Sequence, residues 1–145
     1  MYKHILVPTD GSPLANKAVD AAISFAADCG AKVTGYYAIE DMNMHHAGAY
    51  LTTELREEFD RRAQIAAEEH ATEPAKAASA AGVDFDWRTS KVRHPHEGII
   101  EAANESGSDV IFIATHGHGS LAAALLGSVT QKVLSHSKIP VLVLR

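Results

Sequence analysis

Short apolar runs alternate with amphipathic stretches along the whole of this chain. The runs at residues 5–7, 33–39, 110–113 and 141–144 are rich in β-branched or other large apolar residues, which is typical of buried strands. Between them, apolar residues recur every three to four positions, as they do in helices that pack on one face. Such alternation favours right-handed βαβ units and a parallel sheet with helices on both faces. We therefore expect a doubly wound α/β fold.

Local signals place the helices of the first half. Ser12 is a good N-cap and Pro13 a good first helical residue, and Gly30 stands where a helix would end. The expected inward face of this first helix is Leu14, Ala18, Ala21 or Ala22, and Phe25. A second helical pattern runs from residue 52 or 53 to Gly82, through Leu55, Phe59, Ala63, Ala66, His70, Ala77 and Ala81. Pro74 should kink or split it.

The second half continues the alternation. Charged residues alternate with Val83, Phe85 and Trp87. This alternation predicts a strand at a sheet edge with one solvent-exposed face. His94 and Pro95 begin a helix that stops near Gly107, and a helix follows from Ser128. The last strand is predicted at Val141–Leu144.

Size and composition narrow the class of protein. The chain has 145 residues and a net charge of −5, so we expect one domain over residues 1–145. The acidic balance argues against a nucleic-acid partner, and no apolar run reaches membrane-spanning length, so no membrane partner is expected. The N-terminus lacks the pattern of a signal peptide. The one cysteine, Cys29, excludes an internal disulfide and fits a reducing compartment. We expect a cytoplasmic protein.

A glycine loop follows the apolar run at 110–113. Gly117 and Gly119 lie in the segment 114–120, where glycine allows tight turns and close approach of a ligand. Ser128 and Gln131 have the spacing of a capping box, which predicts a helix start. A strand, a glycine loop and a helix N-terminus together form an anion site. We therefore expect a ligand that carries phosphate.

Two named phosphate motifs do not explain this loop. A Walker A loop requires a lysine before its final serine or threonine, whereas Gly127 is followed directly by Ser128. The segment 117–122 matches G-x-G-x-x-A, but the dinucleotide fingerprint also needs an acidic residue after the next strand. Here that strand is followed only by Arg145.

The pattern does resemble the universal stress protein family, whose ATP-binding members carry G-x2-G-x9-G-[ST]. Gly117 matches the second glycine, nine residues follow, and Gly127 and Ser128 match the final pair. Ala114 replaces the first glycine. The resemblance covers nearly the whole chain and implies the strand order 3-2-1-4-5. It also implies an ATP-binding protein that acts as a stress-response or signalling switch, and a homodimer paired through the last strand, Val141–Leu144.

In an open parallel sheet, ligands bind where the strand order reverses. The implied order puts this reversal between the first and fourth strands. The resemblance then implies that adenine lies near Pro8 and the backbone of Ala38, and that Asp10 serves the ribose or a phosphate-bound Mg²⁺. The nucleotide-binding residues expected are Pro8, Thr9, Asp10, Ala38, Ala114, Thr115, His116, Gly117, His118, Gly119, Gly127, Ser128, Val129 and Thr130.

The nine histidines leave an alternative open. Two His-x-His pairs, at 94–96 and 116–118, both follow predicted strands, and four convergent imidazoles could bind a transition metal. The sequence favours a second interpretation, in which imidazoles lie beside a phosphate and bind it more tightly as pH falls toward 6. Arg93 departs from a family glycine and adds bulk near the crevice. The segment 40–51 could fold over a nucleotide or form a plain connection.

No catalytic residue is expected. Ser120 and Ser128 lie near histidines in the sequence, but no third partner completes a nucleophile, base and orienting group. If ATP is hydrolysed, turnover should be slow, because no arginine finger or water-positioning residue is indicated. Two alternatives to an ATP-dependent switch remain, a dimeric interaction module with an empty crevice and a slow ATPase or phosphotransfer enzyme.

Overall fold

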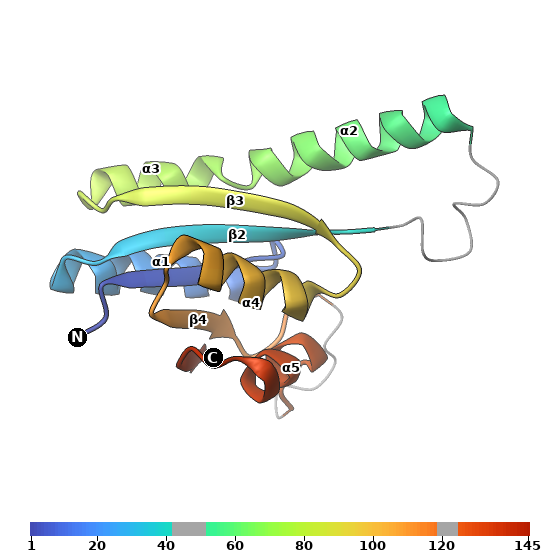
Figure 1. Ribbon diagram of the computed structural model, residues 1–145. Coiled ribbons are helices and arrows are strands. Elements are labelled where there is room, and N and C mark those ends of the chain that lie inside the picture. The colour runs from blue at the N-terminus through green and yellow to red at the C-terminus, as the bar shows by residue number, and fades with distance from the viewer. Residues whose placement is uncertain (42–51, 119–124) are drawn as a thin grey trace.

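The computed structural model describes residues 1–41, 52–118 and 125–145. They form a parallel five-stranded sheet with the order β3-β2-β1-β4-β5, which confirms the expected doubly wound α/β architecture (Figure 1). The elements are β1 (His4–Pro8), α1 (Pro13–Cys29), β2 (Lys32–Glu40), α2 (Thr53–Glu69), α3 (Thr72–Ala80), β3 (Phe85–Val92), α4 (Pro95–Ser106), β4 (Val110–Ala114), α5 (Ser128–His136) and β5 (Val141–Leu144).

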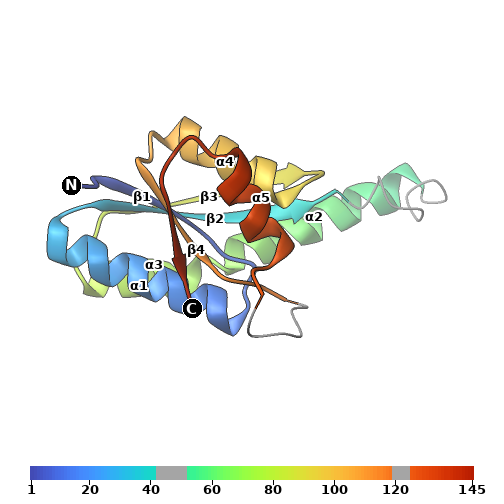
Figure 2. The ribbon, with the colours of Figure 1, turned by 90° about the horizontal axis from the view of Figure 1, so that it is seen from below.

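Helices cover both faces of the sheet. Figure 2 shows α4 on one side of the strands, with α1 and α3 on the other, while α2 projects beyond the sheet. The strand order reverses between β1 and β4, which pair through Ile5 with Val110 and Leu6 with Ile111. The carboxyl ends of these two strands therefore diverge, and this is where a doubly wound sheet opens a crevice.

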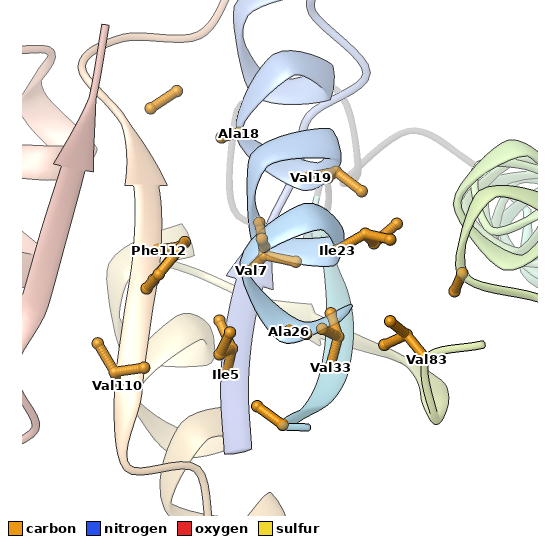
Figure 3. Packing of buried hydrophobic residues seen from close by; sticks show 14 residues of the cluster. Ile5, Val7, Ala18, Val19, Ile23, Ala26, Val33, Val83, Val110 and Phe112 are labelled. Atoms are coloured by element: carbon orange, nitrogen blue, oxygen red, sulfur yellow. The ribbon is translucent and has the colours of Figure 1, made fainter. Parts of the chain in front are cut away.

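Two apolar clusters hold these layers together. On the α1 face, Ile5, Val7, Val33, Val110 and Phe112 pack against α1 (Figure 3). On the other face, the side chains that pack under α4 and α5 are Leu6, Tyr36, Ile99, Ala102, Ala103, Ile111, Ile113 and Val133. Because β1 and β4 contribute to both clusters, residues 5–7 of β1 and 110–114 of β4 are all apolar. This burial on both faces explains the unbroken apolar runs in the sequence.

The termini of α1 and α4 follow the sequence signals. The Ala15 amide donates to Ser12 Oγ at 3.2 Å, so Ser12 caps α1 as predicted. Gly30 and Gly107 end α1 and α4 with φ of 70° and 71°, a left-handed conformation that glycine adopts without strain. α4 begins at Pro95 with His94 as N-cap residue, which is also as predicted.

The expected face of α1 is only partly correct. Ala18 and Ala22 are buried, but Phe25 is 39% exposed. The buried stripe consists mainly of smaller residues, namely Ala15, Ala18, Val19, Ala22, Ile23 and Ala26. Small side chains let α1 lie close to the sheet, while the Phe25 ring reaches Phe112 from the flank at a centroid distance of 5.4 Å.

The long helical pattern after residue 52 is split into α2 and α3. The break falls at His70, the C-cap of α2, while Pro74 lies in the first turn of α3. A proline lacks an amide hydrogen and its ring clashes with the carbonyl four residues earlier, which here is the carbonyl of His70. The predicted helix is confirmed, but the apolar residues that begin its pattern are not buried, since Leu55 and Phe59 are 50% and 58% exposed. The one buried residue of α2 is Ala67.

Two further local predictions need correction. β3 begins at Phe85 rather than Val83 and continues to Val92, although it is a sheet edge as expected. The capping box of Ser128 and Gln131 does not form. Ser128 is the first residue of α5 and Gly127 is its N-cap, while the Gln131 side-chain amide donates to the Leu126 carbonyl at 2.7 Å.

Within the described residues, every helix is too short or too polar to cross a membrane.

Candidate functional site: a cavity between the ends of β1 and β4

A cavity of about 680 Å³ lies at the crevice between β1 and β4. Pro8, Thr9 and Asp10 line it at the end of β1, and Ala114 and His116 line it after β4. Residues from β2, α2, α4 and the first turn of α5 complete its walls. The cavity therefore occupies the position at which open parallel sheets bind ligands.

The structure brings most of the predicted site residues together. Those that line the cavity are Pro8, Thr9, Asp10, Ala38, Ala114, His116, Gly117, His118, Gly127, Ser128, Val129 and Thr130. Thr115 is 8% exposed and does not line it. Gly119 lies outside the described residues. Residues separated by more than a hundred positions thus converge on one cavity.

The N-terminus of α5 presents free backbone donors to this cavity. No side chain caps it, because its N-cap residue is Gly127. The amides of the first helical residues have no acceptor within the helix. Among the described residues, those of Ser128, Val129 and Thr130 also have no backbone acceptor elsewhere, so they can bind a ligand. The Gly127 amide itself donates to the Thr115 carbonyl at 2.7 Å, and the Thr130 hydroxyl donates to the Ala114 carbonyl at 2.8 Å. These two bonds hold the start of α5 against the end of β4.

Asp10 joins the loops that follow β1 and β4. Its carboxylate accepts a hydrogen bond from the Ser12 amide at 2.9 Å and another from the His118 amide at 2.8 Å. His118 Nε2 also lies 3.0 Å from the Asp10 carbonyl oxygen. Burial on its own raises the pKa of Asp10, but the hydrogen bonds from Ser12 and His118 outweigh burial and lower that pKa. Asp10 is therefore ionised at neutral pH and fixes the glycine loop.

Glycine is required at position 117 by this arrangement. A Cβ atom added there would overlap the Asp10 carboxylate. At Gly127, an added Cβ would lie 3.2 Å from His116 Cα and 3.3 Å from the Thr115 carbonyl oxygen. Gly117 and Gly127 thus permit close approach of two loops, a role that the sequence did not indicate for either glycine.

Sequence reasoning missed one wall of the cavity. Tyr36, Tyr37, Ile39 and Glu40 line it from β2, and Ala63 and Ala66 from α2. Tyr37 stacks on His70 at a ring-centroid distance of 4.6 Å, which holds the end of α2 over β2. The small side chains of Ala63 and Ala66 line the same cavity as Ala38.

The four histidines considered as metal ligands do not form one group. His116 and His118 line the cavity, whereas the ring of His96 lies 5.9 Å from that of His94 and 5.4 Å from that of His136. The described part of the chain holds no group of three or more His, Cys, Asp or Glu side chains that could bind a metal ion. The rings of His116 and His118 instead contact the Thr115 hydroxyl, at 3.2 Å, and the Asp10 carbonyl oxygen, at 3.0 Å.

Comparison with known proteins gives this geometry its context. The sequence model of the universal stress protein family matches residues 1–145. A universal stress protein of Thermus aquaticus is 29% identical over 145 residues, which are 100% of both chains. The solved structure of MJ0577, a universal stress protein of Methanocaldococcus jannaschii, is 29% identical and superposes with a TM-score of 0.84 over 99% of this chain and 96% of that one.

A second solved structure bears on the cavity. It is a universal stress protein in complex with cAMP, is 28% identical to this chain, and superposes with a TM-score of 0.71 over 99% of this chain and 97% of that chain. The strand order, the match of the family model over the full chain and these structural similarities all point to the same family. The chain belongs to the universal stress protein family.

Proposed function

We propose that residues 1–145 form one domain that binds ATP or a related adenine nucleotide in the cavity between β1 and β4. In this proposal the protein is a cytoplasmic, nucleotide-dependent switch in a stress response. The observation that carries the proposal is the uncapped N-terminus of α5, which faces a cavity large enough for a nucleotide. Cavities of 300–1,000 Å³ are typical of sites for small molecules and cofactors.

The walls of the cavity suit the parts of a nucleotide. Free amides and the positive end of a helix dipole stabilise phosphate oxygens, so Ser128, Val129 and Thr130 would hold the phosphates together with Gly117 and His118. Adenine would lie toward Pro8 and Ala38, where backbone groups can pair with its edge. The related structure in complex with cAMP supports an adenine ligand.

Mg²⁺ would enter with the phosphates rather than as a resident ion. Both oxygens of the Asp10 carboxylate already accept hydrogen bonds from the protein. Mg²⁺ keeps several waters and takes its other ligands from phosphates and one or two carboxylates, so Asp10 could contact the ion through water while it still fixes the loop. The ribose is the other group that Asp10 could serve.

We also propose that two copies pair through β5. This strand forms one edge of the sheet, and its Leu142 side chain is 39% exposed. An unpaired apolar edge strand is a template for association, and a second copy of the same edge would cover it.

Calorimetric titration with ATP and Mg²⁺ tests the proposed cavity, with Ser128→Glu as the probe variant. A carboxylate at the first position of α5 would compete with phosphate for the same amides, while it favours the helix itself. Ser135→Glu is the matched control, because Ser135 is exposed on the same helix and does not line the cavity. We expect binding by the parent protein and by Ser135→Glu, and at least about tenfold weaker binding by Ser128→Glu.

Other outcomes of the titration would favour the two alternative functions, an interaction module or a slow ATPase. If the parent protein gives no heat with any adenine nucleotide, the crevice is empty and an interaction module becomes the better account. If ATP binds and phosphate is released above the buffer rate, a slow ATPase is indicated. Equal binding by Ser128→Glu and Ser135→Glu would place the nucleotide somewhere other than the N-terminus of α5.

A further inference from the structure

The charges around the cavity do not match those of a triphosphate. Its charged side chains are the carboxylates of Asp10 and Glu40, and no lysine or arginine is present among the described residues that line it. The cation Lys91 of β3 is not a lining residue, and it instead donates to Asp60 at 2.9 Å and lies 3.6 Å from Asp41. The sequence of residues 42–51 and 119–124 also contains neither lysine nor arginine.

The donors available for phosphate are neutral groups. They are the amides at the start of α5 and the Ser128 hydroxyl, because His118 already donates its amide and its Nε2 to Asp10. A helix N-terminus contributes the equivalent of about half a positive charge. That is enough to favour a small anion, but it leaves most of the charge of a triphosphate without a partner. In P-loop NTPases and protein kinases, a lysine and metal ions offset the charge of the triphosphate.

The pKa of Tyr37, which lines the cavity, also indicates a negative potential near Asp10 and Glu40. Burial raises the pKa of Tyr37, and the negative charges of Asp10 and Glu40 raise it further. Tyr37 lines the cavity between these two carboxylates along the chain. An added anion in the cavity therefore meets a negative potential from Asp10 and Glu40, which opposes each further charge on the ligand.

We propose that the cavity selects adenine nucleotides of low charge, so that a cyclic monophosphate or a monophosphate binds more tightly than metal-free ATP. This inference rests on the proposed adenine-nucleotide function and narrows its ligand. The cyclic phosphodiester carries a single negative charge, which the helix end and the neutral donors can hold. ATP becomes a competitive ligand once Mg²⁺ neutralises part of its charge.

The test compares Kd values for 3′,5′-cyclic AMP, AMP and ATP by calorimetry in EDTA, with the ATP titration repeated in Mg²⁺. For the parent protein in EDTA we expect ATP to bind at least about tenfold more weakly than cyclic AMP. Addition of Mg²⁺ should reduce the difference between the Kd values of ATP and cyclic AMP. Tighter binding of metal-free ATP than of cyclic AMP would overturn the inference while it leaves the proposed function in place.

A charge-adding variant tests the physical cause. Ser128→Lys places a cation at the phosphate end of the cavity, and Ser135→Lys adds the same charge seven positions further along α5, outside the cavity. We expect Ser128→Lys to lower the Kd of metal-free ATP by a factor at least about tenfold larger than the factor by which it lowers the Kd of cyclic AMP. Ser135→Lys should leave the ratio of these two Kd values unchanged. An equal effect of Ser128→Lys on both nucleotides would contradict selection by charge. Absence of binding by every nucleotide would refute the proposed function instead.

Discussion

Asp10 connects the two loops that form the floor of the cavity. Its carboxylate accepts hydrogen bonds from amides on both loops, and Gly117 is the residue that lets the second loop approach it. A ligand that uses the α5 amides thus meets loops already fixed by the protein. Such prior ordering reduces the conformational entropy lost when a ligand binds.

Gly117→Ala tests this contact. The added methyl group overlaps the Asp10 carboxylate, and overpacking of this kind typically costs about 1–3 kcal/mol of the free energy of unfolding. In an Asp10→Ala background the same substitution should cost much less, because the clashing group is gone. Chemical denaturation of the four proteins in this double-mutant cycle measures the coupling. Additive effects would mean that the two residues do not oppose each other.

Asp10→Asn tests the charge of the same residue. Because the pKa of Asp10 is lowered in the folded protein, its ionised form stabilises the fold above about pH 4. That contribution is lost as pH falls through the lowered pKa. We expect Asp10→Asn to cost about 1–3 kcal/mol at pH 7, since one loop amide loses its acceptor, and to change less on acidification.

Thermal unfolding from pH 7 to pH 3 compares Asp10→Asn with the parent protein. Asp20→Asn is the control, because Asp20 is an exposed carboxylate on α1. A stability difference between the parent protein and Asp10→Asn that persists unchanged at pH 3 would show that ionisation of Asp10 does not stabilise the loops.

Among the elements, helix ends were predicted better than helix faces. Ser12, Gly30 and Gly107 act through their own backbone or side chain, so local sequence was sufficient to place them. The faces of α1 and α2 depend on how closely each helix approaches the sheet, which local periodicity does not report. The predicted capping box at Ser128 failed for a related reason, since the Gln131 side chain finds the Leu126 carbonyl instead.

Ser12→Ala tests the cap that starts α1. The Ser12 hydroxyl accepts from the Ala15 amide inside the buried end of the helix, and loss of an N-cap of this kind costs about 1 kcal/mol. Ser24→Ala is the matched control, because Ser24 is exposed in the middle of the same helix and alanine suits that position. Urea denaturation should show destabilisation for Ser12→Ala alone. Equal stability of the two variants would mean that the hydroxyl does not cap α1.

For the whole molecule, the order of the strands explains why the site was predictable. Residues after β1 and β4 must meet wherever the strand order reverses, so Asp10, Ala114 and His116 could be assigned to one crevice before their positions were known. The strand order itself came from the resemblance to a family. The wall formed by Tyr37, Ala63 and Ala66 could not be predicted, because it depends on the angle at which α2 leaves the sheet.

Leu142→Asp tests association through β5. Leu142 is 39% exposed on this edge strand, whereas Val143 packs against the core under α4 and α5. A charge at Leu142 therefore acts on a partner surface rather than on the fold. We expect Leu142→Asp to be monomeric by light scattering at concentrations where the parent protein is dimeric. Leu55→Asp, on the 50% exposed Leu55 of α2, should remain dimeric, and a dimeric Leu142→Asp protein would place the interface elsewhere.

The central claim is that the first turn of α5 holds the phosphate of an adenine nucleotide. The most direct test follows backbone amide resonances in ¹⁵N-labelled protein during titration with cyclic AMP and with ATP and Mg²⁺. The account predicts that the largest shifts occur at Ser128, Val129 and Thr130, with smaller shifts at Asp10 and Ala38. Saturable shifts confined to other parts of the protein, or none with either ligand, would contradict it.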